Sequence, residues 1–459
     1  MQEFKIEYLR KKQKMSQGEL ADRLNISRQA VSEWERGISL PSVEKLITLS
    51  EIFDVSLDYL IKGKESSNER NESMDKTNLD YLHFANMKNT LGYVMGEKNG
   101  LIASIPKKEY VGNTLVVGGA RTGKTTNYII PNILKSLERG ESVIVIDHSK
   151  EIYENIKDKI SQYGFNLQVI DFTNPFDSIK FDLCSEVYAN SKTPVLSDKY
   201  LRLIYKTVLA KHQDDPIVFN LLKMIIEARK QTTQSISELI DEFMNCSSEE
   251  VKKKISSLPL DWPTKQMLKL MPDKSITQIQ LKIKGIICEL FPSKEFLNMF
   301  FDGDAKTKDI VSPKTITIIV PDFFNENSIR LLGMLLDLTF MKITLKDIKI
   351  EERVNMFLDE YGNISEHFNL INNLSYLDKN IAISIIVQSV GQLKTSKDIV
   401  LNNFKNFLYL GSFNTNDIAV FSEFFEISEN EIRHLNLDKL IFKRDYFDAC
   451  ILNKVNINS

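Results

Sequence analysis

The chain has 459 residues, of which 42% are hydrophobic and 26% are charged, and its formal net charge at pH 7 is −3. This length predicts about three domains, at roughly 150 residues each. The nearly balanced charge excludes a global positive field, so any contact with nucleic acid has to come from local patches.

Two further features of the composition concern the compartment. The four cysteines never form a C-x-x-C pair, which indicates buried thiols in a reducing compartment rather than disulfides or a metal site. No apolar run reaches about 18 residues, and the N-terminus has no apolar signal region. We therefore expect a cytoplasmic protein that does not itself insert into a membrane, although partners could recruit it to one.

The first 64 residues have the pattern of a small all-α domain. Ser16, with Glu19 three residues later, is a capping box that opens a helix. Ser27 caps the next helix after a short turn. The expected helices cover residues 17–24, 28–36, 42–53 and 56–61, after a first helix that contains Phe4, Ile6, Leu9 and Met15.

Many residues of this domain match one DNA-binding family. They are Ser16, Gln17, Glu19, Leu20, Ala21, Leu24, Ile26, Ser27, Val31, Ser32, Trp34, Glu35, Gly37, Pro41, Leu46, Leu57 and Leu60. The domain thus resembles the helix-turn-helix of the phage-repressor family, of the Cro-like or xenobiotic-response-element type. The resemblance implies that the helix over residues 28–36 enters the major groove and that Gln17 contacts a phosphate.

The exposed face of that third helix is expected to read DNA. Arg pairs with guanine and Gln with adenine in two-pronged fashion, so Arg28 and Gln29 are candidates for contacts with base edges. The face that we expect to meet DNA carries Arg28, Gln29, Ser32 and Glu33. The alternative is a helical bundle kept for protein contacts alone. Because the charges of this domain are nearly balanced, a single copy should bind DNA weakly, which predicts a homo-oligomer.

Residues 65–90 separate this domain from the rest of the chain. They are polar and lack periodicity, which predicts a flexible linker. A short surface helix over residues 80–87 is the alternative.

From residue 91 onward the pattern changes to α/β. Near-continuous apolar, β-branched runs predict a mainly parallel sheet with helices on both faces. Residues 185–304 interrupt the series with helical spacing and predict an all-α insertion between two parts, 91–184 and 305–459, of one domain. The expected strands are residues 114–117, 142–146, 167–170, 315–320, 354–358, 381–387 and 407–410.

The stretch of residues 118–125 fits the phosphate-loop pattern G-x-x-x-x-G-K-[ST]. A strand-like run precedes it and a helical segment from Thr126 follows, as the pattern requires. Backbone N–H groups of such a loop surround the phosphates, Lys124 would reach the β- and γ-phosphates, and the Thr125 hydroxyl would hold Mg²⁺. The sequence therefore predicts a site for ATP and Mg²⁺ made by Gly118, Gly119, Ala120, Arg121, Thr122, Gly123, Lys124, Thr125 and Thr126.

Two later strands end in polar residues that fit the same chemistry. The run of residues 354–358 is followed by Asp359 and Glu360, the Walker B pattern. We expect Asp359 to hold Mg²⁺ through water and Glu360 to polarise the attacking water. Gln388 follows residues 381–387, which resembles the position where RecA-like motors have a residue that senses the γ-phosphate. The alternatives are an acidic pair that begins a surface loop and an ordinary loop glutamine.

Further motifs occur in the order of one family. Besides the patterns above, they are Ile130-Pro131-Asn132, residues 143–151 and 358–363, Gln388-Ser389 with Gln392-Leu393, Leu410-Gly411-Ser412, and Asn416-Asp417. From residue 91 the chain resembles the type IV secretion coupling proteins, conjugative DNA-transfer ATPases of the FtsK-like, RecA-fold group. The resemblance implies a RecA-like P-loop NTPase that moves DNA through a hexameric ring. It also implies an arginine from the neighbouring subunit, for which Arg433 and Arg444 are candidates.

Two features depart from that family. A DNA-reading domain precedes the NTPase where the family has membrane-spanning helices, and residues 148–150 replace the usual loop, so no catalytic role is assigned to them. We expect a soluble, DNA-dependent ATPase that moves or recruits the DNA of a mobile element, with a relaxase or type IV secretion channel components as candidate partners. The alternatives are an ATP-gated transcription regulator, whose oligomerisation controls operator binding, and a defence or partition NTPase on the same fold.

Overall fold

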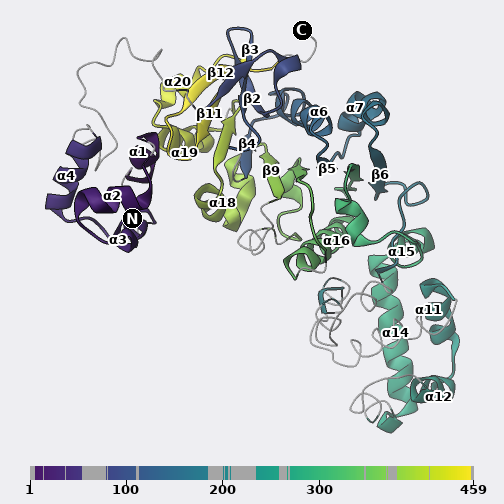
Figure 1. The fold of residues 1–459 in the computed structure, drawn as a ribbon. Helices are drawn as coiled ribbons and strands as arrows, with labels where there is room; N and C mark the ends of the chain where they lie inside the picture. Colours follow the sequence, from purple (N-terminus) through teal and green to yellow (C-terminus); the bar gives the residue numbers. More distant parts are fainter. Residues whose placement is uncertain are drawn as a thin grey trace. The chain divides into compact units, whose positions relative to one another are not determined.

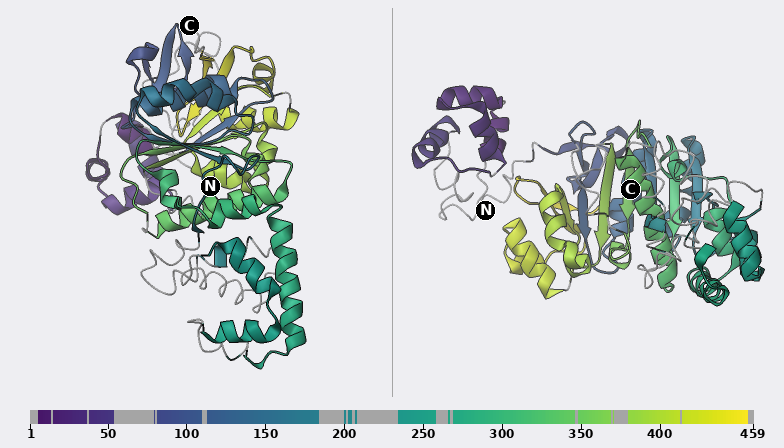
Figure 2. Two further views of the ribbon diagram at one scale, coloured as in Figure 1. Left: turned by 90° about the vertical axis from the view of Figure 1, so that its right-hand side faces the viewer. Right: turned by 90° about the horizontal axis from the view of Figure 1, so that it is seen from below.

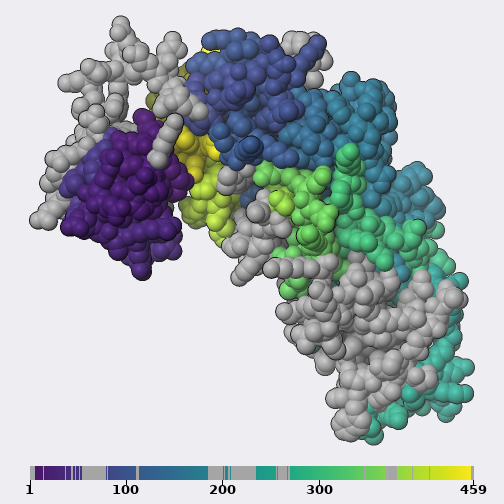
Figure 3. Space-filling model, viewed as in Figure 1, coloured from purple at the N-terminus to yellow at the C-terminus, as the bar shows by residue number. Residues whose placement is uncertain are grey.

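The computed structural model describes most of the chain (Figures 1 and 3). The chain divides into two compact units. The first unit contains residues 1–80 and 443–450, and the second contains residues 81–442 and 451–459. The described residues are 6–53 except 14 and 37, 79, 81–109, 113–183, 200, 202–204, 207, 234–257, 266, 269–345, 348–368, 370, 380–412 and 414–455.

The N-terminal unit is helical, as expected. Ser16 Oγ accepts a hydrogen bond from the Glu19 N–H, and the Glu19 carboxylate accepts one from the Ser16 N–H, so the expected capping box is confirmed. Asn25, with a φ of 53°, ends the second helix in the left-handed region. The expected helix over residues 56–61 lies outside the described residues. The helices are α1 (Ile6–Lys12), α2 (Gln17–Leu24), α3 (Arg28–Glu35) and α4 (Val43–Phe53).

The core of this unit lies between the helices. Leu20 and Ala21 of α2 are buried, as are Val31 and Trp34 of α3, so these apolar residues fix the angle of the two helices across the turn. This packing leaves the opposite side of α3 exposed, where Arg28 and Gln29 lie.

The second unit is built on one sheet, in which the described residues contribute twelve strands in the order β1-β3-β2-β12-β11-β10-β4-β9-β8-β5-β7-β6. The seven strands from β10 to β6 pair in parallel, which confirms the expected mainly parallel sheet. They are β4 (Thr114–Val117), β5 (Ser142–Ile146), β6 (Asn166–Asp171), β7 (Thr315–Val320), β8 (Val354–Leu358), β9 (Ile381–Val387) and β10 (Asn406–Tyr409).

Helices cover both faces of this sheet, as its buried strands require. The left view of Figure 2 shows the blue helices α6 and α7 on one face and the green helix α16 on the other. No helix among those described combines the length and apolar composition needed to cross a membrane. The helices around the sheet are α6 (Ile130–Glu138), α7 (Glu151–Gln162), α16 (Glu326–Thr344), α18 (Lys397–Asn403), α19 (Thr415–Phe425) and α20 (Glu429–Arg433).

Five strands beside the parallel set were not expected from the sequence. The linker and helix predictions are wrong where they reach residues 83–85, because these residues form a strand whose His83 pairs with Ser104. Short segments of this kind carry little periodicity, and distant partners decide their pairing. The five strands are β1 (His83–Ala85), β2 (Tyr93–Lys98), β3 (Leu101–Ile105), β11 (Lys439–Arg444) and β12 (Cys450–Asn453).

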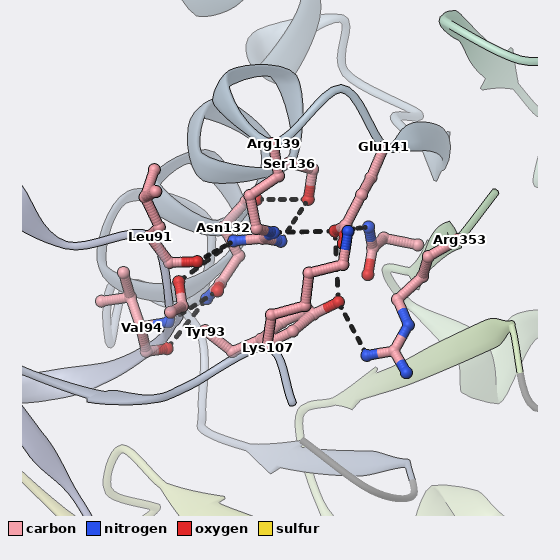
Figure 4. A network of polar contacts seen from close by, with 11 residues as sticks. Leu91, Tyr93, Val94, Lys107, Asn132, Ser136, Arg139, Glu141 and Arg353 are labelled. Carbon is pink, nitrogen blue, oxygen red and sulfur yellow. Dashed lines mark hydrogen bonds and ion pairs between the residues drawn. The ribbon is translucent and has the colours of Figure 1, made fainter. Parts of the chain in front are cut away.

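A buried polar network holds β2 against the parallel part of the sheet (Figure 4). Glu141, before β5, accepts hydrogen bonds from the Tyr93 hydroxyl at 3.2 Å, Arg139 Nε at 2.8 Å and Asn355 Nδ2 at 2.9 Å. Burial acts to raise the pKa of Glu141, but Arg139 and the hydrogen bonds outweigh it and hold the pKa below its usual value. From α6, Asn132 exchanges two hydrogen bonds with the backbone of Val94 and extends the contact.

The described part of residues 234–301 is helical. Helices α11 and α12 both contact α14, and Phe296 and Phe300 of α15 pack on Phe172, which follows β6. The first part of the expected insertion lies mostly outside the described residues, so a separate all-α domain over 185–304 stays a prediction. These helices are α11 (Ile236–Asn245), α12 (Ser248–Ser257), α14 (Asp273–Leu290) and α15 (Lys294–Phe301).

Candidate functional site

The phosphate-loop sequence lies between β4 and a helical segment. Its first residues are tied to neighbouring strand ends, since the Gly118 N–H donates to the Val387 carbonyl at 3.1 Å and the Gly119 N–H to the Gly411 carbonyl at 2.8 Å. The chain then enters a π-helical turn, Thr125–Ile129, that continues into α6. Strand, glycine-rich loop and helix therefore follow one another as the pattern predicts.

Gly123 is required by the shape of this loop. Its φ of +87° lies in the left-handed region, and a Cβ there would fall 1.9 Å from Asn127 Nδ2. Asn127 Nδ2 donates to the Gly123 carbonyl at 2.9 Å. The loop therefore needs a glycine at this position for both conformation and space.

Lys124 folds back over the loop. Its side chain is buried, and Nζ donates to the carbonyls of Gly118 at 2.8 Å and Gly119 at 3.1 Å. Thr122 Oγ1 also donates to the Gly119 carbonyl, at 2.9 Å. The ammonium therefore lies inside the curve of the loop, where it can meet an anion that the loop surrounds.

Asp359 and Glu360 come directly after β8, and β9 alone separates β8 from β4 in the sheet. Burial, followed by the nearby Glu360 carboxylate, raises the pKa of Asp359 to about 6, while Lys124 and the Glu360 N–H act to lower it. Lys124 and Asp359 thus act electrostatically on each other. The two motifs meet at one edge of the sheet because the carboxyl ends of neighbouring parallel strands lie side by side.

Gln388 follows β9, between the other two motifs. Its Nε2 donates to Glu360 Oε1 at 2.8 Å, and its backbone N–H donates to Gln392 Oε1 at 2.8 Å. Glu360 has a φ of 52°, so the backbone turns sharply after Asp359. The structure therefore brings together Lys124, Asp359, Glu360 and Gln388, the residues that the sequence placed in three separate motifs.

Asp417 of α19 joins the loops on one side of this site. It is fully buried and accepts hydrogen bonds from Ser389 Oγ at 2.8 Å, the Val390 N–H at 3.1 Å and Ser412 Oγ at 2.9 Å. Through these hydrogen bonds Asp417 holds the loop after Gln388 against the loop after β10. The sequence analysis named Asn416-Asp417 only as part of the family resemblance. The sequence missed Lys454, whose Nζ donates to the carbonyls of Thr122 and Leu410, because one lysine near the C-terminus carries no local signal.

The loop after β5 has internal partners. Asp147 is buried and accepts from the Tyr153 N–H at 2.7 Å, and Lys150 Nζ donates to Asp171 Oδ2 at 2.7 Å. Burial raises the pKa of Asp147, although the backbone N–H donors of α7 act against it. Asp147 and Lys150 therefore stabilise the loop at the ends of β5 and β6.

The candidate DNA-reading residues lie on or beside α3. Arg28 and Gln29 are exposed and Ser32 and Glu33 half-buried, and Gln29 Nε2 donates to Glu33 Oε1 at 3.1 Å. Gln17 Nε2 donates to Glu35 Oε2 at 2.7 Å, and Glu35 also pairs with Arg10. Gln17 therefore has a partner within the domain, and its contact with a phosphate stays a prediction.

Fold and sequence together define the class: an α/β protein with a phosphate-loop sequence at the carboxyl ends of its parallel strands, and with a helix-turn-helix domain before it. Residues 6–60 match the helix-turn-helix family, and residues 72–280 match the type IV secretory system conjugative DNA transfer family. These two matches confirm both resemblances found in the sequence.

Solved structures agree on the fold. The bacterial conjugative coupling protein TrwBdeltaN70, in its unbound form, aligns over 80% of this chain and 88% of its own, with a TM-score of 0.56 and 12% identity. TrwB in complex with the ATP analogue ADPNP aligns over 78% and 87%, with a TM-score of 0.55 and 13% identity. At these identities the likeness shows the fold alone, and it confirms the α/β class.

Curated relatives match the N-terminal domain. The uncharacterized HTH-type transcriptional regulator YqaE of Bacillus subtilis (strain 168) is 48% identical over 61 residues, 13% of this chain and 51% of that protein. The HTH-type transcriptional regulator DicA of Escherichia coli (strain K12) is 41% identical over 61 residues, 13% of this chain and 45% of that protein. This chain thus spans about half the length of each of these relatives.

Proposed function

We propose that this protein is a DNA-dependent ATPase of the coupling-protein kind, which moves or recruits the DNA of a mobile element. Its helix-turn-helix domain selects the DNA sequence, and the hydrolysis of ATP drives the movement. The observation that carries the proposal is the meeting of Lys124, Asp359, Glu360 and Gln388 at the ends of three neighbouring strands. A phosphate-binding lysine, an acidic pair and a polar sensor are the groups that hydrolysis of a triphosphate requires.

In this proposal each residue has one task. The loop N–H groups and Lys124 bind the phosphates of ATP, and Glu360 orients and polarises the attacking water. Gln388 changes partner between Glu360 and the γ-phosphate and so reports the nucleotide state. TrwB, which shares the fold, has been solved with ADPNP and with ADP and Mg²⁺.

The residues present also fit a magnesium ion. The Thr125 hydroxyl and the Asp359 carboxylate are hard oxygen ligands of the kind that Mg²⁺ prefers. Within the described part of the chain no group of three or more His, Cys, Asp or Glu side chains gathers to hold a metal, so phosphates and water would complete the shell. A bound ion would neutralise charge on the β- and γ-phosphate oxygens.

DNA contact and assembly complete the proposal. Arg28 and Gln29 read base edges, while Ser32, Glu33 and Gln17 contribute the surrounding contacts. Because one such domain binds weakly, several copies in a homo-oligomer, a hexamer in the ring form, would bind DNA by multivalency. A relaxase or type IV secretion channel components are the partners that this function would require.

The test is steady-state ATP hydrolysis by the purified full chain, without DNA, with single strands and with duplex. We expect hydrolysis to rise when DNA is added, and the Lys124→Ala variant to show no hydrolysis under any condition. If saturating single- and double-stranded DNA both leave turnover unchanged, DNA-driven movement is wrong. If the Lys124→Ala variant turns over like the wild type, the assigned site is wrong.

A second candidate function is an ATP-gated transcription regulator. The observation that favours it is that both of the N-terminal domain's relatives above bear the name of transcriptional regulators. This candidate predicts that the affinity for a duplex site changes between the ATP and ADP states without movement along DNA. Measuring duplex affinity in both nucleotide states, together with displacement of a bound roadblock protein, separates the two functions.

A further inference from the structure

Lys454, which follows β12, reaches the phosphate loop from a distant part of the sequence. Its backbone N–H donates to the Asp438 carbonyl at 2.7 Å, which anchors the residue beside β11. Its Nζ donates to the Thr122 carbonyl at 2.8 Å and to the Leu410 carbonyl at 2.9 Å. One ammonium therefore ties the phosphate loop to the end of β10.

The Thr122 carbonyl sets the direction of a loop N–H group. A trans peptide is planar, so the N–H of Gly123 points opposite to the carbonyl of Thr122. The N–H groups of such a loop are the donors that surround a phosphate. Gly123, with its φ of +87°, has the freedom to turn this peptide unless a partner fixes it. Lys454 is that partner, because its Nζ holds the Thr122 carbonyl in this peptide.

The end of β10 supports both halves of the loop. In the first half of the loop, the Gly119 N–H donates to the Gly411 carbonyl. In the second half, Lys454 Nζ donates to both the Thr122 and the Leu410 carbonyls. Burial lowers the pKa of Lys454, although Asp438 acts to raise it. The ammonium is thus partly removed from water, where hydrogen bonds from a charged donor are stronger.

We propose that Lys454 is a positioning residue for the nucleotide. By holding the Thr122 carbonyl, it keeps the following amide of the loop directed towards the phosphates, and it does so from 332 residues further along the chain. The inference rests on the proposed nucleotide site and adds to it a residue outside every motif of the sequence. The C-terminal strands thereby become part of the nucleotide site.

The test uses the full chain and four forms: wild type, Lys454→Met, Lys454→Arg and the control Lys439→Met on β11. The affinity for a fluorescent ADP analogue with Mg²⁺ is measured by titration, and KM and kcat by steady-state hydrolysis. We expect Lys454→Met to weaken affinity by about tenfold, the worth of one charged hydrogen bond. KM should rise by a similar factor, with a smaller change in kcat. Lys454→Arg should restore most of the affinity, because a guanidinium has enough N–H donors for both carbonyls. Lys439→Met should match the wild type.

A folding defect is separated from a loss of positioning by thermal unfolding without nucleotide. Affinity is then measured at a temperature where every form is folded by circular dichroism. Wild-type affinity of folded Lys454→Met would overturn the inference, and so would a failure of folded Lys454→Arg to recover any affinity. If the wild type itself does not bind the analogue, the proposed function fails first. If it binds but DNA does not stimulate hydrolysis, only the DNA-driven part of that function fails.

Discussion

The side-chain amide of Gln388 donates a hydrogen bond to the carboxylate of Glu360 over 2.8 Å, between the ends of the neighbouring strands β9 and β8. The two residues lie 28 positions apart in the sequence, and the parallel pairing of their strands brings them together. This bond orients the carboxylate that we propose as the group that polarises water. It also connects that carboxylate to the loop of residues 388–392.

Substitutions at this pair should lower turnover without abolishing nucleotide binding. Glu360→Gln keeps the shape of the side chain but removes the base, so we expect kcat to fall by about 10²- to 10⁴-fold. Gln388→Ala leaves the base unoriented and should produce a smaller fall. Nucleotide titration beside steady-state kinetics checks both variants. Rapid turnover by Glu360→Gln would remove Glu360 from its proposed role.

Asp417 should affect both stability and turnover, because it holds the loop that carries Gln388. Asp417→Ala leaves the Val390 N–H without its buried acceptor, a loss of about 1–3 kcal/mol in the free energy of unfolding. Because the loop loosens, we expect kcat to fall more than nucleotide affinity does. Asp417→Asn retains one acceptor oxygen and serves as the matched variant. It should recover much of kcat, and equal losses in the two variants would contradict this account.

The DNA-reading face of α3 can be tested by a double substitution. Arg28→Ala together with Gln29→Ala removes both proposed contacts with base edges, each worth about 1–3 kcal/mol of discrimination. We expect binding to the cognate duplex to fall to the level of unrelated duplex, as measured by fluorescence anisotropy at a fixed salt concentration. Lys11→Ala, at an exposed ion pair of α1, is the control. Unchanged cognate binding by the double variant would move DNA reading elsewhere.

Glu141 should make the stability of the sheet depend on pH. Its pKa in the folded state lies below the usual value of about 4.3. The ionised network therefore stabilises the fold above that value, and this stabilisation is lost as the pH falls through the lower, folded-state pKa. Calorimetric unfolding between pH 3 and pH 7, at intervals of about one unit, would record the loss.

Glu141→Gln tests the same network at neutral pH. The variant leaves Arg139 paired with a neutral group in a buried place, so we expect a loss of about 3 kcal/mol. It should also lose the acid-dependent part of the wild-type profile. Glu154→Gln, at an exposed pair with Lys157, is the control and should change stability by less than about 1 kcal/mol. A wild-type acid profile in Glu141→Gln would show that another group controls the pH dependence.

The sequence predicted the parallel strands because their apolar runs are long and local. Residues 142–146 and 315–320 are buried throughout, so each is recognisable without its neighbours. The short strand β1 and the last strands β11 and β12 have no such signal. Strand β1 forms by pairing with β3 and β12 by pairing with β2, while β11 lies between β12 and β10 in the sheet. The linker prediction extended too far because residues 83–85 pair with a strand outside the segment.

The sequence by itself determined the local motifs, because each depends on a few consecutive residues. These motifs are the spacing from Gly118 to Thr125, the acidic pair after an apolar strand, and the caps of α2 and α3. Only the tertiary structure decided which of these residues lie together in one site. The order β4-β9-β8 sets Gln388 between the phosphate loop and Glu360, and β12 brings Lys454 to the Thr122 carbonyl. The reason is that a helix cap or a glycine turn depends on a few consecutive residues, whereas strand order is fixed by burial summed over the whole sheet.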